Sequence, residues 1–232
     1  MKRFWKEVAV AREDGGWGIA LDTRPVRTPG RAPLAVPSRA LVDAIADEWR
    51  NAGETVDPRA MPLTGLANAA IDHIAPNPRA FAAGLARYGE SDLLYYRAAD
   101  PEPLVERQAA AWDPILAWAR GRYDVHFETV SGVMPRAQPP LTVTRLAEAI
   151  ATRPAFELAA LSPIVTVSGS LILALALLEG AADPPTIWRA ARVDEDWQEE
   201  QWGADTLATQ AAEARRHDFD AGVRFLELLR AP

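Results

Sequence analysis

The sequence predicts an α+β protein in which a small N-terminal antiparallel sheet with a covering helix precedes a larger helical region. Short apolar stretches separated by Gly- and Pro-containing turns occupy residues 4–36. From residue 38 onwards the apolar side chains recur at helical spacing. Residues 158–178 then form a run of 21 residues without a charged side chain. We expect the helical region to pack around this run.

The composition is typical of a folded globular protein and argues against some classes of binding partner. Of the 232 residues, 49% are hydrophobic and 25% are charged, and cysteine is absent. The absence of cysteine excludes disulfides and thiol chemistry and fits a reducing compartment. A net charge of -7 argues against nucleic-acid binding, which requires a basic surface. No apolar signal sequence follows Met1, so we expect the bacterial cytoplasm, with the mitochondrial matrix as second choice.

The first 36 residues alternate between strand and turn signals. Phe4–Val10 and Trp17–Leu21 are expected to pair as a hairpin across the turn at Glu13–Gly16. Two further short strands are predicted at Val26–Thr28 and Leu34–Val36, which would complete a small meander. The glycines of the first turn do not open a helix, so they indicate a hairpin and not a phosphate-binding loop.

A helix with Ser38 as its N-cap is expected to run to about Ala52 and to cover the sheet. The segment Gly53–Pro62 contains two prolines and a glycine, which predicts a boundary between domains 1–58 and 59–232. Charge supports this division. Residues 1–58 contain nine basic and nine acidic side chains, so the acidic excess belongs to the second part.

Several helices are predicted between this boundary and the uncharged run. They are expected over residues 62–74, 78–88 and 104–123, with another helix around residues 146–150. Pro114 should kink the third of them, because it removes one backbone donor.

The uncharged run Leu158–Leu178 has two interpretations. About 20 apolar residues can span a bilayer. However, Pro163, Gly169 and acidic flanks at Glu157 and Glu179 favour a helix buried by protein over a transmembrane span. Ser162 and Pro163 are expected to start this helix, and Gly180 to end it.

The last third is predicted to form one long helix from Pro184 to about His217. One stripe of this helix is apolar apart from a single glutamate; its members are Val193, Trp197, Glu200, Ala204, Leu207 and Ala211. A carboxylate on such a face must find a donor, reach solvent or change its pKa. Further acidic residues surround it without an intervening Lys or Arg; these are Asp194, Glu195, Asp196, Glu199 and Asp205.

This acidic helix also has two interpretations. A run of charges is often only a solvated helix face. An acidic, tryptophan-bearing helix is also suited to bind a basic and partly apolar protein surface, since aromatic side chains anchor interfaces. Trp202 lies off the stripe and is expected near the surface.

Catalytic patterns are weak. His73, His126 and His217 have no second histidine at metal-ligand spacing, and no serine lies in a nucleophile elbow. The acidic cluster lacks the glycine-turned loop of a calcium site. We therefore expect no catalytic residue, cofactor or metal. Two alternatives stay open: a carboxylate-dependent hydrolase using Glu200, Asp205 and His73, and a carrier whose uncharged helix lines a cavity for a hydrophobic ligand.

Short stretches along nearly the whole chain resemble the chaperones that assemble the catalytic head of F-type ATP synthase, in the class that acts on the alpha subunit. These stretches are Arg3–Val8, Leu21–Pro29, Glu48–Trp49, Met61–Thr64, Leu66–Asn68, Ile71–Asp72, Tyr96–Arg97, Gln108, Trp112–Pro114, Ser168–Gly169, Asp194–Glu195, Trp197–Gln198, Glu200, Trp202–Gly203 and Asp205. Their order along the chain is more specific than any one of them.

The resemblance implies a non-enzymatic, monomeric chaperone that binds the unassembled alpha subunit, shields its beta-facing surface and does not insert into a membrane. We expect the recognition element to centre on Glu200. The other candidates for partner binding are Glu195, Trp197, Trp202, Asp205, Trp49 and Asp72. Trp49 and Asp72 are also candidates for holding the two domains together.

Overall fold

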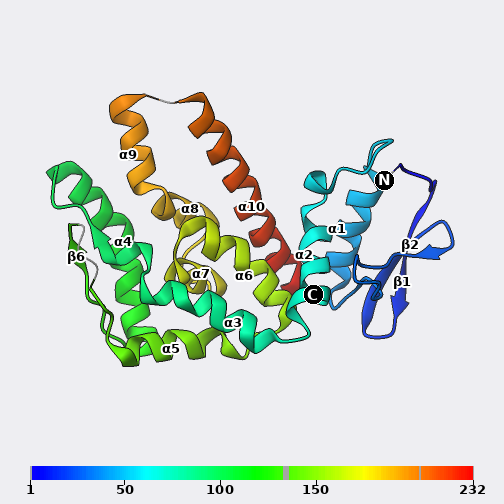
Figure 1. Ribbon diagram of the computed structural model, residues 1–232, viewed down its shortest axis with the longest axis horizontal. Coiled ribbons are helices and arrows are strands. Elements are labelled where there is room, and N and C mark those ends of the chain that lie inside the picture. The colour runs from blue at the N-terminus through cyan, green and yellow to red at the C-terminus, as the bar shows by residue number, and fades with distance from the viewer. Residues whose placement is uncertain (1, 133–135, 204, 232) are drawn as a thin grey trace. The chain divides into compact units, whose positions relative to one another are not determined.

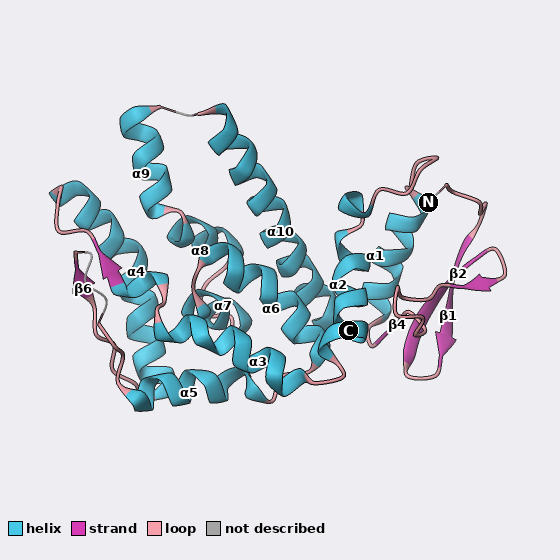
Figure 2. Cartoon of the chain, viewed as in Figure 1, coloured by secondary structure: helices cyan, strands magenta, loops and turns pink. Residues whose placement is uncertain are grey.

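The computed structural model describes residues 2–132, 136–203 and 205–231, and it has the predicted α+β composition (Figures 1 and 2). Contacts within the chain divide it into two compact units. One unit comprises Met1–Pro78, Arg153–Ala160 and Asp220–Pro232, and the other comprises Arg79–Thr152 and Leu161–Phe219. This division differs from the expected boundary after residue 58, because residues 59–78 belong to the first unit.

The sheet of the first unit is built on β2. Strand β1 (Val8–Glu13) pairs antiparallel with β2 (Gly16–Leu21), and β2 also pairs with β3 (Arg24–Pro25) and β4 (Ala35–Val36). The predicted hairpin is therefore confirmed, but its first strand begins four residues later than expected.

The late start of β1 has a local cause. The carboxylate of Asp22 accepts hydrogen bonds of 3.0 Å from the backbone N–H groups of Lys6 and Glu7. These two donors are used by a side chain and not by a strand ladder. The predicted strand at Val26–Thr28 is also displaced, since β3 ends at Pro25.

Helix α1 (Arg39–Arg50) covers the sheet as predicted. The Ser38 side chain caps it by accepting a hydrogen bond from the N–H of Leu41. The helix contacts both β1 and β2. Its buried residues Leu41 and Ile45 and the sheet residue Ile19 belong to the core of this unit.

Two carboxylates link residues 58–78 to the preceding part of the first unit. This segment contains the 3-10 helix η1 (Pro58–Ala60), α2 (Pro62–Ala69) and the π-helix η2 (Ala70–Ile74). Glu48 of α1 accepts hydrogen bonds from the first turn of α2. Asp72 of η2 accepts them from Thr28 and Gly30.

Among its described residues, the second unit is helical apart from one short pair of parallel strands, β5 and β6, which the sequence patterns did not predict. Its elements up to the uncharged run are α3 (Pro78–Ala86), η3 (Arg87–Glu90), η4 (Leu93–Tyr95), β5 (Tyr96–Arg97), α4 (Glu102–Tyr123), β6 (Val130–Ser131) and α5 (Pro140–Ala151). Pro114 lies inside α4, which continues past it.

The uncharged run forms two helices instead of one. Helix α6 (Ala155–Ser168) is separated from α7 (Leu171–Leu178) by Gly169, whose φ is +65°. Ser170 then caps α7 by accepting a hydrogen bond of 3.0 Å from the N–H of Leu173. The predicted start at Ser162 and Pro163 is wrong, since both residues lie within α6.

Helix α7 confirms the buried interpretation of the run. All eight of its residues are buried, and it ends beside Gly180, as predicted, where φ is +72°. Within the described ranges, no helix is both long and apolar enough to cross a membrane.

The predicted helix from Pro184 to His217 is three helices: α8 (Pro184–Ala191), α9 (Val193–Trp202) and α10 (Thr206–Arg230). Arg192 leaves the helical conformation with φ -114° and ψ 8°. Gly203 ends α9 with φ 85° and ψ 161°, a conformation that favours glycine. The stripe residue Ala204 lies outside the described residues.

Candidate functional site

Helix α9 is the centre of the candidate site, and none of its ten residues is buried. Its first turn contains Asp194, Glu195 and Asp196. Carboxylates at this end of a helix interact favourably with the helix dipole, which explains why so acidic a segment is helical. The helix contacts α4 through residues that are only half-buried, so polar contacts contribute much of what holds it in place.

Arg192 is the main internal partner of this acidic helix. Its side chain is only 12% exposed and lies 3.0 Å from Glu195, 2.9 Å from Asp196 and 3.5 Å from Glu199. These carboxylates follow it by three, four and seven residues and so lie on one face of the helix. One arginine thus forms ion pairs with three acidic side chains.

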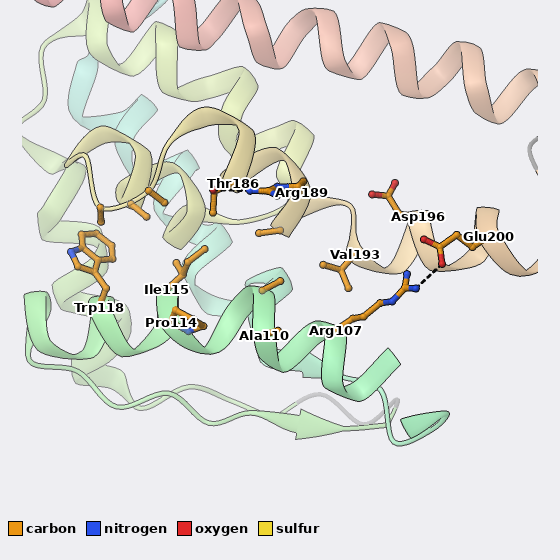
Figure 3. Close-up of a pocket in the computed structure, with 15 residues that line it drawn as sticks. Arg107, Ala110, Pro114, Ile115, Trp118, Thr186, Arg189, Val193, Asp196 and Glu200 are labelled. Atoms are coloured by element: carbon orange, nitrogen blue, oxygen red, sulfur yellow. Dashed lines mark hydrogen bonds and ion pairs between the residues drawn. The ribbon is translucent and has the colours of Figure 1, made fainter. Parts of the chain in front are cut away.

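Glu200 is paired with an arginine from another helix. Its carboxylate lies 2.7 Å from the guanidinium of Arg107 on α4 (Figure 3). That guanidinium lies 4.9 Å from the ring centre of Trp197. The hydrogen bond from Arg107 lowers the pKa of Glu200. The Glu200 side chain is 52% exposed, so the pair is open to solvent.

Two further contacts fix α9 at its N-terminal end. Gln108 of α4, which is buried, donates a hydrogen bond of 2.6 Å to Asp194 and accepts one of 2.8 Å from the N–H of Ala98. Arg215 of α10 lies 3.1 Å from Glu195. The acidic residues are therefore less isolated than the sequence suggested, because three arginines approach them in space.

The C-terminal end of α9 exposes large apolar side chains. Trp202 is 78% exposed, and Leu207 at the start of α10 is 74% exposed. Between them, Asp205 accepts a hydrogen bond of 3.3 Å from the N–H of Ala208, in the first turn of α10. An exposed tryptophan and leucine beside carboxylates are typical of a surface that another molecule covers.

Three grooves border α9. The largest, about 620 Å³, includes Glu200 and lies beside α4 and α8. A second of about 380 Å³ includes Glu195, Trp202 and Asp205 beside α10. A third of about 390 Å³ includes Trp197 and Trp202 beside the segment between β5 and α4. Five of the predicted site residues are thus gathered on one surface.

The other two predicted residues lie in the first unit. Trp49 is only 8% exposed and packs against Trp5, with ring centres 5.2 Å apart. Asp72 accepts hydrogen bonds of 2.6 Å from the hydroxyl of Thr28 and 2.8 Å from the N–H of Gly30. Both residues make structural contacts within that unit, and Asp72 joins the expected N-terminal domain to the residues that follow it.

The hydrolase alternative requires Glu200 and Asp205 in one pocket, with His73 as an optional third member. Glu200 and Asp205 line different grooves. Among the described residues, no group of three or more His, Cys, Asp or Glu side chains could hold a metal ion. The arrangement around α9 offers charge and exposed apolar area, which suit binding.

Sequence reasoning missed the basic partners of the site. Arg192 was detectable, because it precedes three acidic residues at helical spacing. Arg107 and Arg215 come from other helices, and only the fold brings them to α9. The large groove was also missed, since its apolar lining is mostly alanine.

Comparisons with known proteins identify the family of the chain. A family model described as "ATP12 chaperone protein" matches residues 2–120. The crystal structure of Atp12 from Paracoccus denitrificans is 44% identical, covers 99% of this chain and 98% of its own, and superposes with a TM-score of 0.93. The structure of Atu1473 from Agrobacterium tumefaciens is also 44% identical, with 99% and 86% coverage and a TM-score of 0.92.

A curated relative, the mitochondrial protein atp12 of Schizosaccharomyces pombe, is 24% identical over 215 residues, which are 88% of this chain and 74% of the relative. The fold and these matches together define the class of protein, a chaperone, which binds other polypeptides. The chain belongs to the ATP12 chaperone family, the ATP synthase assembly chaperones that its sequence resembles.

Proposed function

We propose that this chaperone binds the unassembled alpha subunit of F-type ATP synthase and shields the surface that later contacts the beta subunit. The observation that carries the proposal is the unburied helix α9 with its neighbouring residues. This surface has six carboxylates, at residues 194, 195, 196, 199, 200 and 205, and three arginines, at 107, 192 and 215. The remaining charge of -3 favours a basic client surface.

The two tryptophans of α9 supply the apolar part of such an interface. Trp202 is exposed and offers a large apolar surface at low entropic cost, and Trp197, which is half-buried, precedes it by five residues on the same helix. A subunit surface destined for burial is apolar and aggregates when left uncovered. Covering it with an acidic and aromatic helix prevents wrong contacts until the correct partner arrives.

The chaperone must also let its client go. An affinity of about 1 μM, or roughly 8 kcal/mol, is enough to compete with aggregation and weak enough for exchange. We propose that the beta subunit displaces the chaperone by occupying the same surface of the alpha subunit. The bacterial origin of the two similar structures supports the bacterial cytoplasm as the place of this exchange, with the mitochondrial matrix as the alternative.

Co-expression tests the proposal directly. The tagged chain is produced together with F-type alpha and beta subunits and then recovered by its tag. Retention of alpha without beta supports the proposal. Retention of beta alone, or of neither subunit, contradicts it.

A charge reversal then tests the site. Glu200→Lys places a cation beside Arg107 and should abolish capture of the alpha subunit. Because the Glu200 side chain is half exposed, the melting temperature should stay close to that of the wild type. Glu148→Lys on α5 makes the same change at another exposed helical position and should leave capture unchanged. Equal loss of capture in both variants, or unfolding of Glu200→Lys, would show that Glu200 is not a recognition residue.

A further inference from the structure

The groove of about 620 Å³ beside α9 has a feature that the charged surface does not explain. Six of its fifteen lining residues are alanines, so its floor is apolar but has little side-chain volume of its own. Alanines come from α4, from α7 and the turn after it, and from α8, while Trp118 of α4 closes one end (Figure 3). A volume of this size is typical of sites that bind apolar groups.

The charged residues of the groove are concentrated on α9, α4 and α8, and all but one have an ionic partner. Glu200 is paired with Arg107, and Asp196 is paired with Arg192. Arg189 of α8 donates hydrogen bonds to two neutral groups, the carbonyl of Pro185 at 3.3 Å and the hydroxyl of Thr186 at 3.2 Å. Together with the hydrogen bonds from Thr186, its charge also contributes to the lowered pKa of Asp183, which does not line the groove. Within the part of the chain that the structure describes, no carboxylate lies within 4.0 Å of its guanidinium.

We propose that this groove receives an apolar segment of the client polypeptide, whose bulky side chains fill the space above the alanines and whose carboxylate pairs with Arg189. The inference rests on the proposed function and names the kind of client segment that is bound. It follows from complementarity, since small residues in the floor accept large side chains. A charged group without an ionic partner is also best matched by a group of opposite sign.

Continuity with α9 favours a polypeptide over a free lipid. Val193, Asp196 and Glu200 line the groove and also belong to the acidic helix. A chain that contacts α9 can therefore extend into the groove without a break. The two regions bind different parts of the same client. Basic side chains of the client contact α9, and apolar side chains together with one carboxylate contact the groove beside α8.

Filling the groove tests the inference. Ala110→Trp places a large side chain in the groove from an exposed position inside α4, where the helical backbone accepts it. Ala117→Trp makes the same change at another exposed position of α4 that does not line the groove. We expect the Ala110 variant to bind the alpha subunit at least tenfold more weakly, about 1.4 kcal/mol. The Ala117 variant should change affinity less than twofold.

Charge reversal provides an independent second test. Arg189→Glu should weaken binding of the alpha subunit by about tenfold, and Arg189→Gln by less, because the glutamine removes the attraction without adding repulsion. Arg79→Glu on α3 is the matched control, since it is exposed and has no ionic partner among the described residues. Circular dichroism shows whether each variant is folded.

The outcomes separate the groove from the proposed function. If the wild-type chain binds no alpha subunit, the proposed function fails before the groove is tested. If the wild type binds and both Ala110→Trp and Arg189→Glu bind equally well, the groove is not a client site and the proposed function stands. Native mass spectrometry adds one outcome: a bound fatty acid that Ala110→Trp removes, with client affinity unchanged, would make the groove a lipid site and overturn the inference.

Discussion

Replacing Glu48 with alanine should destabilise the first unit by about 2–3 kcal/mol, because Glu48 caps a helix other than its own. Helix α2 has no side-chain cap at Met61. Instead, the Glu48 carboxylate of α1 accepts hydrogen bonds of 2.8 Å from the N–H groups of Leu63 and Thr64 and one of 2.7 Å from the Thr64 hydroxyl. These amides belong to the first turn of α2, where no backbone carbonyl is available.

The magnitude follows from these three contacts. Loss of a helix cap costs about 1–2 kcal/mol, and loss of the hydroxyl hydrogen bond adds about 1 kcal/mol. Burial of the Glu48 carboxylate raises its pKa, and this cost of burying a charge offsets part of the stability that its three hydrogen bonds contribute. Thr64→Val removes only the hydroxyl contact and should cost about 1 kcal/mol.

Urea unfolding of the two single variants and the double variant measures the effect. We expect the double variant to cost about 1 kcal/mol less than the sum, since both changes remove the same hydrogen bond. Hydrogen exchange should show faster exchange at the amides of Leu63 and Thr64 in Glu48→Ala. A cost below about 0.5 kcal/mol, with the protection of both amides unchanged, would refute the capping role.

Two further predictions concern the core of the second unit. Burial raises the pKa of Asp92 from 3.8 to about 6, although Ser170 and three backbone amides donate hydrogen bonds that oppose the shift. The native state therefore holds this proton more tightly than the unfolded state. The free energy of unfolding of the wild type, relative to that of Asp92→Asn, should then fall by up to about 3 kcal/mol as the pH rises from below 3.8 to above about 6. Urea unfolding of both proteins at these two pH values measures this difference, and a difference that does not change with pH would refute the reasoning. Trp112→Phe should cost about 3 kcal/mol, because the fully buried ring loses volume and leaves the Ala190 carbonyl without its hydrogen bond of 2.7 Å; a loss below 1 kcal/mol in thermal unfolding would show that the site relaxes.

The sequence predicted those elements whose signals are local. The hairpin follows from its turn, α1 from periodicity and its Ser38 cap, and the burial of α7 from the uncharged run with its acidic flanks. The failures have physical causes. Ser162 and Pro163 form a start signal that α6 overrides, since a proline costs one backbone hydrogen bond and the apolar surroundings of this helix outweigh that loss.

The candidate site was predictable in its composition but not in its geometry. The exposed tryptophan and the carboxylates of α9 were recognisable from residue pattern and family resemblance. Their partners Arg107 and Arg215 lie far away in sequence, so no pattern within the helix could identify them. The alanine-lined groove gives no sequence signal either, because alanine is common in any helix.

The basic partners of α9 share one chemical property that widens the conditions under which this surface keeps its charge. Lys2 and Lys6 are the only lysines of the chain, so every permanent cation beyond them is an arginine. A guanidinium stays protonated at any pH a cell meets. Acetylation and amine-reactive cross-linkers, which modify lysine side chains, leave these arginines untouched. The positive charges beside α9 are thus insensitive to alkalinity and to the modifications that act on lysine side chains.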